Sequence, residues 1–396
     1  MTEVMPLTGT GQSFWVPAFE IEVNGAPMPR NVVRDISEIT FEDDVDGLDS
    51  FTFVLNNWDT DRLHAQFVGE GVDDALWKVV QPGNGVRLSM GYRGESTDLR
   101  LMTTGALTTV DADMPDSAAT RLTVRGLSVL DRFRDRQYTW SWPQSATGTV
   151  RDSEIARDLG HAPDQPPGKP GLLGVARVRV SEEALATETQ RAHVFMNNQY
   201  PIVFLLQLAR RNGYDVFLTR SATGEDELWF GPSRHVRDRT YVLEWGRTLT
   251  SLRASISTAR QVSKVTVLGW DRVRKEAVRR EATVAAHGGG LPATTRRFAA
   301  ATTREEVVTD HVVSTGAQAQ QLAVDLLHDI TSRLVEVEGV VVGLPDLRAG
   351  RRVRIERVGP YLTGSYFVTS TRHVVNDSGY RTTFKARLEG PQGATA

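Results

Sequence analysis

Histidine and carboxylate side chains are the groups of this chain that could bind a metal ion or move protons. We interpret His328, on an expected helix, and His373, on an expected strand, as structural or surface histidines. None of the histidines has the HExxH spacing or another short metal-ligand spacing, so the sequence predicts no metal site. The eight histidines are His64, His161, His193, His235, His287, His311, His328 and His373.

Carboxylate pairs could hydrolyse a glycosidic bond, but that reaction needs two carboxylates held apart across a cleft. Adjacent residues on a strand point to opposite sides, so neighbours in the sequence do not indicate such a site. The acidic run 42–47 does not match the spacing of an EF-hand calcium loop, and we expect a solvated turn there. The adjacent pairs include Asp43 with Asp44, Glu182 with Glu183, and Glu305 with Glu306.

Other catalytic and cofactor motifs are missing from the sequence. The chain has no cysteine, which excludes disulfides, thiolate metal sites and cysteine nucleophiles. It has no GxSxG nucleophile motif, and Gly83 and Gly85 are not followed by the Lys-Ser/Thr of a phosphate loop. We therefore predict no catalytic residue, no cofactor and no enzymatic activity.

Composition narrows the class of protein further. A chain of 396 residues with 40% hydrophobic and 24% charged residues is expected to form several globular domains. The net charge of −3 argues against a nucleic-acid-binding protein. Residues 1–14 lack the pattern of a secretion signal, and the apolar runs are too short to cross a bilayer. We expect folding in the cytoplasm and no membrane insertion by the chain itself.

The first part of the chain is expected to be a β domain. Residues 1–15 are predicted to be a flexible leader, and residues 16–130 a first β-barrel domain. In this domain, alternating hydrophobic residues from Phe19 predict strands, and Asn24-Gly25 predicts a hairpin turn.

The next part, residues 131–240, is predicted to be a linker and an α+β middle domain. The linker is rich in aromatic residues, which we interpret as domain-docking residues: Phe133, Tyr138, Trp140 and Trp142. Helices are predicted at 153–159 and 201–212, a loop at 161–174, and strands at 214–219 and 227–230.

The last part is predicted to be a second β-barrel domain with a helical insert, residues 241–390, followed by a flexible tail, 391–396. The Ala/Gly/Thr-rich segment 285–302 is expected to be a flexible excursion. A helix is predicted at 316–334, where Thr315 and Gln318 form a capping box.

A strand-turn-strand pattern occurs once near each end of the chain. A glycine precedes the first strand, a Thr-Gly opens the second, and a third strand ends in glycine, so Gly83, Gly105 and Gly126 align with Gly350, Gly364 and Gly390. The intervals differ, which indicates two similar structures rather than a regular array. The predicted fold class is therefore mainly β, with an α+β middle region and two related small β-barrels flanking a mixed domain.

Four segments resemble, in the right order, the hub proteins of contractile injection machines: the phage late control D family and the hub part of VgrG proteins. The C-terminal segment carries Pro345, Ala349-Gly350, the run Thr363–Val368, His373 and Gly379–Thr382. The others are 204–214 with 228–231, 262–271, and the start of the first domain, 17–55. Together they cover nearly the whole chain.

The resemblance implies a structural baseplate hub of a phage, tailocin or extracellular injection system, assembled in the bacterial cytoplasm. Such hubs are homotrimers with two related barrels per chain, and they adapt a sixfold tail tube to a threefold spike. Implied partners are the spike protein, tail tube subunits and baseplate wedge proteins, with no nucleic acid. VgrG proteins continue into an OB-fold and a needle, whereas this chain ends at Ala396, so the spike is expected to be a separate chain.

Two other functions are alternatives to the hub. One is a tail-associated enzyme that degrades the cell wall, which would need convergent carboxylates in a cleft. The other is a monomeric carbohydrate-binding β-protein, against which the two middle helices argue.

Overall fold

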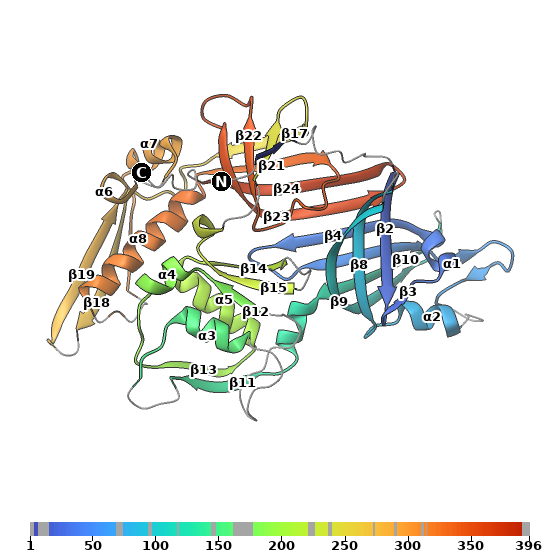
Figure 1. Ribbon diagram of the computed structural model, residues 1–396, viewed down its shortest axis with the longest axis horizontal. Coiled ribbons are helices and arrows are strands. Elements are labelled where there is room, and N and C mark those ends of the chain that lie inside the picture. The colour runs from blue at the N-terminus through green and yellow to red at the C-terminus, as the bar shows by residue number, and fades with distance from the viewer. Residues whose placement is uncertain are drawn as a thin grey trace.

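The computed structural model describes residues 4–6, 16–68, 74–93, 97–116, 119–143, 148–160, 177–220, 226–236, 240–271, 274–288, 291–309, 313 and 315–389. Figure 1 shows a β-rich N-terminal part, a mixed middle part and a β-rich C-terminal part. The loop expected at 161–174, the tail 391–396 and Gly390 lie outside the described residues.

The N-terminal β unit is an antiparallel sheet in the order β4-β5-β10-β9-β8-β2-β3. Its strands alternate buried and exposed residues, and the buried faces form one core that contains Phe41, Phe51 and Leu122. The strands are β2 (Val16–Val23), β3 (Ala26–Pro27), β4 (Ile36–Asp44), β5 (Ser50–Asn56), β8 (Gly85–Arg93), β9 (Thr97–Asp113) and β10 (Arg121–Ser128). Short elements beside them are α1 (Arg30–Asp35), β6 (Trp58–Asp59), β7 (His64–Ala65) and α2 (Asp74–Val80).

The middle unit packs helices on two small sheets around its own core. Phe133 and Trp142 of the aromatic linker are buried in this core, and Trp142 stacks on Phe204 at 5.8 Å. Pro201 begins α5, and Gly213 ends it in the left-handed conformation. The elements are η1 (Val129–Arg134), β11 (Tyr138–Trp142), α3 (Asp152–Leu159), β12 (Arg177–Val180), α4 (Glu182–Thr187), β13 (Val194–Gln199), α5 (Pro201–Asn212), β14 (Asp215–Arg220), β15 (Asp226–Gly231) and η2 (Ser233–His235).

The C-terminal β unit has the order β16-β22-β23-β24-β21-β17. Its core contains Val353, Tyr366 and Phe384. The strands are β16 (Thr240–Glu244), β17 (Leu249–Ile256), β21 (Val335–Val342), β22 (Arg352–Glu356), β23 (Gly364–Asn376) and β24 (Gly379–Glu389).

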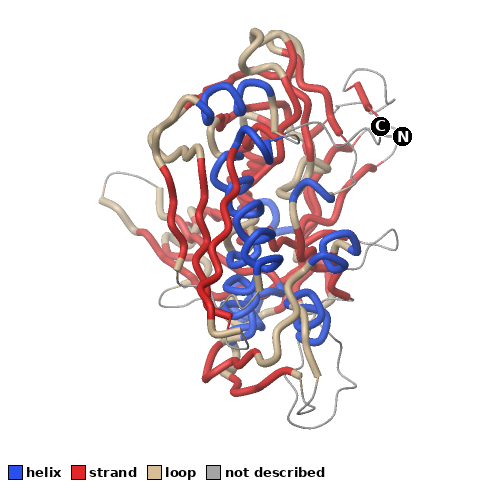
Figure 2. The backbone as a smooth tube through the Cα atoms, turned by 90° about the vertical axis from the view of Figure 1, so that its left-hand side faces the viewer, coloured by secondary structure: helices blue, strands red, loops and turns tan. Residues whose placement is uncertain are grey.

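An insert between β17 and β21 forms a three-stranded sheet covered by a long helix, and Figure 2 shows the helices gathered between flanking strands. The segment 285–302, expected to be a flexible excursion, instead contains two helices. Alanine favours helix, and Ala299 is fully buried in the core of the insert, to which α8 also contributes. The elements are β18 (Lys264–Asp271), β19 (Glu276–Thr283), α6 (Val284–His287), α7 (Ala293–Ala300), β20 (Glu305–Val308) and α8 (Gly316–Ser332).

Two helix starts differ in detail from the sequence expectation. Thr315 caps α8 by accepting from the Gln318 backbone N–H at 3.3 Å, while the Gln318 side chain donates to the Gln190 carbonyl. Helix α3 begins at Asp152, one residue before the expected start, and Arg151 is its N-cap, with the Glu154 carboxylate accepting from the Arg151 backbone N–H at 2.7 Å.

The fold is mainly β with a mixed middle region, as the sequence predicts. The two β units are both present, and a feature that the sequence did not reveal joins them. Strand β4 pairs with β5 on one side and with β23 on the other, so a single 14-stranded sheet runs through both units (Figure 1).

Part of the expected leader also belongs to this sheet. Strand β1 (Val4–Pro6) pairs in parallel with β16, in the register Val4–Thr240 to Pro6–Val242. Among the described residues, no helix is long and apolar enough to cross a membrane.

Candidate functional site: the joint between the two β units

The two β units repeat the same backbone hydrogen bonds before their first long strand. In the N-terminal unit, the Gly83 N–H donates to the Leu107 carbonyl at 2.8 Å, and the Leu107 N–H donates to Asn84 at 2.9 Å. In the C-terminal unit, Gly350 donates to Val368 at 2.9 Å, and Val368 donates to Arg351 at 2.9 Å. Both glycines have a positive φ, of 94° and 82°. Leu107 therefore corresponds to Val368.

A β-bulge recurs one residue further along. The register of β9 with β10 shifts at Thr108, and that of β23 with β24 shifts at Thr369. Each threonine hydroxyl donates to a carbonyl of the next strand, Thr108 to Arg125 at 3.3 Å and Thr369 to Lys385 at 3.2 Å. The two positions are structurally equivalent.

A second bulge is repeated in the strands at the far edge of each unit. Ser37 is the extra residue of β4 and its hydroxyl donates to the Val54 carbonyl at 3.1 Å. Thr250 is the extra residue of β17 and donates to Val340 at 2.8 Å. Strand β17 of the C-terminal unit therefore corresponds to β4 of the N-terminal unit.

This equivalence corrects part of the glycine alignment made from sequence. Gly83 does match Gly350, but Gly105 lies inside β9 and pairs with Val86, whereas Gly364 is the first residue of β23. Gly105 is required by close packing rather than by a turn, because a Cβ there would lie 2.0 Å from the Leu127 carbonyl oxygen.

The joint itself is the antiparallel pairing of β4 with the second half of β23, in the register from Ser370–Asp44 to Asn376–Glu38. On its solvent side, Arg372 lies 3.3 Å from the Glu42 carboxylate. Exposed pairs of this kind contribute little stability.

The buried side of the joint is centred on Asp43. Its carboxylate accepts from Arg348 Nε at 2.5 Å, from the Ala349 backbone N–H at 3.2 Å, and from the Thr371 hydroxyl. The carboxylate is only 5% exposed, so the solvated turn expected for the acidic run is wrong at this residue. A buried carboxylate needs such partners because removal from water is costly for a charge.

Arg348, which lies in the segment before β22, contacts two strands at this point. Besides Asp43 of β4, it donates to the Met102 carbonyl of β9 at 3.0 Å, and its guanidinium lies 4.5 Å from the Phe41 ring centroid. Asp49 is buried beside the same group, and burial together with the Asp43 charge raises the pKa of Asp49 to about 8. One guanidinium thus stands beside two carboxyl groups, of which Asp43 is bonded to it.

His373 completes the buried side. Its Nε2 lies 2.9 Å from the Leu347 carbonyl oxygen, which can only accept, so this nitrogen carries the proton. Nδ1 is then free to accept from Tyr380 at 2.9 Å or Thr382 at 3.1 Å. Burial lowers the pKa of His373 to about 4, which keeps the ring neutral at pH 7.

A second buried network joins the C-terminal β unit to the middle unit. Glu389 accepts from Arg352 at 2.8 Å, from Arg387 at 3.0 Å and from the Ser233 hydroxyl at 2.6 Å. Arg387 also donates to Asp215 of β14 at 2.8 Å. Positive and negative side chains alternate through this network, so each buried charge has a partner of opposite sign.

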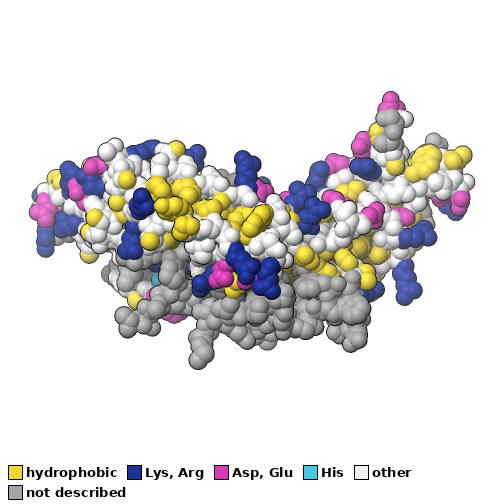
Figure 3. Space-filling view, turned by 90° about the horizontal axis from the view of Figure 1, so that it is seen from above, with side chains coloured by type: hydrophobic (Ala, Val, Ile, Leu, Met, Phe, Trp, Pro, Cys, Tyr) yellow, Lys and Arg dark blue, Asp and Glu magenta, His cyan; other side chains and the backbone are white. Residues whose placement is uncertain are grey.

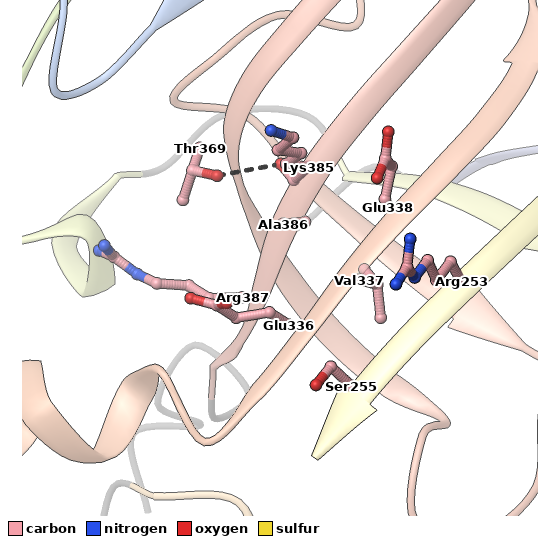
Figure 4. Close-up of a pocket in the computed structure, with 9 residues that line it drawn as sticks. All are labelled: Arg253, Ser255, Glu336, Val337, Glu338, Thr369, Lys385, Ala386 and Arg387. Atoms are coloured by element: carbon pink, nitrogen blue, oxygen red, sulfur yellow. Dashed lines mark hydrogen bonds between the residues drawn. The ribbon is translucent and has the colours of Figure 1, made fainter. Parts of the chain in front are cut away.

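An open groove of about 290 Å³ lies on the outer face of the C-terminal β unit. Figure 4 shows Arg253 of β17, Glu338 of β21 and Lys385 of β24 in a row across three strands. The charges alternate in sign along this row, which is a cross-strand ladder rather than a set of converging catalytic groups.

The carboxylates that are adjacent in the sequence do not come together in one site. Glu182 pairs with Arg157 and Glu305 with Lys264, both at partly exposed positions. Within the described residues, no three His, Asp or Glu side chains are grouped to hold a metal ion.

Exposed hydrophobic side chains mark further surfaces. Figure 3 shows them in separate patches among charges of both signs. Trp270 and Val307 of the insert are 54% exposed, and Ile256 at the end of β17 is 42% exposed.

The residues of the joint were not found from the sequence. Asp43 and Arg348 are 305 residues apart, so no local spacing connects them. The available signal was the arginine directly before Ala349-Gly350, next to a repeated glycine.

Comparison with solved structures places the fold among phage tail proteins. The 43 kDa tail protein of prophage MuSo2 from Shewanella oneidensis matches with a TM-score of 0.64 and 14% identity, over 94% of this chain and 98% of the other. The tail protein of Neisseria meningitidis MC58 matches at 0.59 and 14%, over 94% and 97%. The E. coli c3393 protein, a component of the type VI secretion system, matches at 0.53 and 11%, over 94% and 79%. The expected mainly β fold is therefore one that phage tail proteins share.

Sequence comparison gives a different kind of result. No curated protein matches the chain. The sequence profile of the family described as the Alg8 N-terminal domain matches residues 173–377. The matched segment ends in the turn between β23 and β24, so it omits the strand that lies between β21 and β23.

Proposed function

For a chain that belongs to the Alg8 N-terminal domain family and has the fold of phage tail proteins, we propose a structural function. It is the baseplate hub of a contractile phage tail-like machine of the late control D type. It forms a homotrimer that adapts the sixfold tail tube to the threefold spike.

The observation that carries this proposal is the equivalence of the two β units. They share the strand order and two bulges. They also share the pair of backbone hydrogen bonds made at Gly83 and at Gly350, before the first long strand. Three copies of a chain with two equivalent units present six similar faces, while the assembly keeps threefold symmetry on its other side. This is the geometry that an adaptor between a sixfold tube and a threefold spike requires.

The partners follow from the proposed position of the protein between the tail tube and the spike. Tail tube subunits bind the ring of β units, the spike protein binds the opposite end, and wedge proteins bind the periphery. Assembly takes place in the bacterial cytoplasm, and the product is part of a phage or phage tail-like particle.

The role is mechanical and not enzymatic. The titratable groups of the joint bond to one another in the protein interior, where no substrate reaches them. Purified protein is expected to release no fragments from peptidoglycan. Muralytic activity that is lost on substitution of a surface carboxylate would contradict this role.

Native mass spectrometry and light scattering test the assembly. The expected mass is that of three copies, for the chain alone or together with its spike. A chain that stays monomeric at high concentration and with the spike would contradict the hub and favour a monomeric binding protein.

A further inference from the structure

We propose that β17 of one copy pairs antiparallel with the second half of β9 in the next copy, and so repeats between chains the β4–β23 joint within each chain. The inference rests on the proposed homotrimer, for which it names the interface.

The first reason is that β17 is the equivalent of β4 and has a free edge. Both strands pair with the matching neighbour, β5 or β21, through the same bulge. Strand β4 uses its other edge to pair with β23, whereas the other edge of β17 has no partner strand within the described residues, beyond a single bridge of Leu249 to Trp245 at its start. Residues Arg253–Ile256 are exposed along this edge. An unpaired strand edge of this length is a template for another strand.

The second reason is that β9 leaves free the segment that corresponds to the paired half of β23. Because Leu107 corresponds to Val368, the segment 109–113 of β9 corresponds to 370–374 of β23. Strand β8 pairs with β9 only from Thr97 to Ala106. Beyond that point β9 pairs with β10 on one side, and its other side has no partner strand in the part of the chain that the structure describes. Within the described residues, the molecule therefore carries the two strand edges that such a joint needs, and neither has a partner strand.

The equivalence also sets the register of the proposed pairing. Val374–Thr40 within the chain corresponds to Asp113–Arg253 between chains. In the same way, Arg372–Glu42 corresponds to Asp111–Ser255, and Thr371–Asp43 corresponds to Val110–Ile256.

This register also matches the chemistry of the two strands. The ladder Lys385, Glu338 and Arg253 alternates in sign and ends on a cation (Figure 4). Asp113 of the next copy supplies the missing anion. Ile256, which is 42% exposed, is covered by Val110.

One difference between the two joints fits their different roles. The joint within the chain buries the hydrogen-bonded pair Thr371 and Asp43, which is protected from water once the chain has folded. The joint between chains has the apolar pair Val110 and Ile256 at that position. Since apolar side chains leave no unsatisfied polar group when the copies are apart, this joint suits surfaces that fold first and associate later.

Cysteine crosslinking tests the pairing directly, because the chain has no cysteine of its own. The variant S255C/D111C is expected to form disulfides between copies under mild oxidation, visible as covalent oligomers on non-reducing gels. The matched control E42C/R372C places cysteines at the corresponding pair of the internal joint. It is expected to form a disulfide within the chain and no oligomers.

The outcomes of the crosslinking experiment distinguish a failure of the β17–β9 pairing from a failure of the proposed hub. Covalent oligomers that end at three copies support both. A native trimer that fails to crosslink in S255C/D111C, while the control closes its disulfide, overturns the pairing and leaves the hub intact. Crosslinked products that continue beyond three copies support the pairing but contradict the closed trimer.

Charge reversal gives a second readout without new covalent bonds. R253D alone or D113R alone places like charges opposite each other and is expected to weaken association roughly fivefold per joint, while R253D/D113R restores it. Additive losses in the double variant, measured by analytical ultracentrifugation, would contradict contact between the two positions.

Discussion

At the scale of single residues, the joint depends on one guanidinium beside two carboxyl groups. Arg348 binds Asp43 directly, and Asp49 lies buried next to both. A buried ion pair is tolerated when both members stay paired, and losing one member leaves the other as an isolated buried charge. The strength of the joint therefore depends on which of these groups is charged.

Arg348→Met keeps an unbranched apolar side chain and removes the charge that compensates Asp43. The expected loss in the free energy of unfolding is about 3–5 kcal/mol, measured by urea denaturation. Arg372→Met, at the exposed pair of the same joint, is the control, and its expected loss is below about 1 kcal/mol. Equal losses in both variants would contradict a buried charge centre.

Asp49→Asn tests the second carboxyl group through its pH dependence. The pKa of Asp49 is raised from 3.8 to about 8, so between these values the folded chain holds a proton that the unfolded chain has released. The wild-type protein is then expected to lose stability relative to the variant as pH rises from 3.8 to about 8. Parallel stability profiles of the two proteins across this range would contradict a protonated Asp49.

At the scale of elements, the repeated bulges and glycines define the two β units. Gly105 and Gly126 lie where strands pass close to neighbouring groups, and a Cβ at Gly126 would lie 2.1 Å from the Phe51 ring. These positions need glycine for space rather than for a turn.

Gly105→Ala tests this requirement. A methyl group 2.0 Å from the Leu127 carbonyl oxygen forces β9 away from β10, with an expected loss of roughly 1–3 kcal/mol in the free energy of unfolding. Gly47→Ala is the control, because its nearest neighbour would be Asp44 Cβ at 3.6 Å, and its expected effect is within about 0.5 kcal/mol. A neutral Gly105→Ala would show that the strands can move apart freely.

Elements with strong local signals could be predicted from the sequence. Helix α5 has its proline start and glycine stop, and α8 has its threonine cap. The helices in 285–302 were missed, because an alanine-rich segment is stabilised there by packing on α8 rather than by its own pattern. Gly105 was wrongly aligned with Gly364, because both follow a threonine and the sequence does not show a close approach of strands.

At the scale of the whole molecule, buried networks connect units that are separate in the sequence. The joint of β4 with β23 unites the two β units, and Arg387 with Asp215 fixes the middle unit on the C-terminal one. Such contacts link residues more than a hundred positions apart, so the sequence predicted the units but not their connections.

Arg387→Gln tests how the middle unit is held. Loss of the guanidinium leaves Asp215 and Glu389 buried without their shared partner, with an expected loss of about 3–5 kcal/mol. Hydrogen exchange is expected to accelerate in β14 and η2 and to stay unchanged in β8–β10. Equal acceleration throughout the N-terminal β unit would mean that the contact stabilises the whole molecule rather than one interface.

The continuity of the sheet through β4 and β23 has a mechanical consequence. A force directed along these strands loads their hydrogen bonds in shear, so the whole register from Ser370–Asp44 to Asn376–Glu38 must yield together. A force across the strands would instead peel the bonds apart one after another. A chain built in this way resists thrust along the strands far better than bending across them, and the direction of the strands therefore marks the axis along which it can carry load.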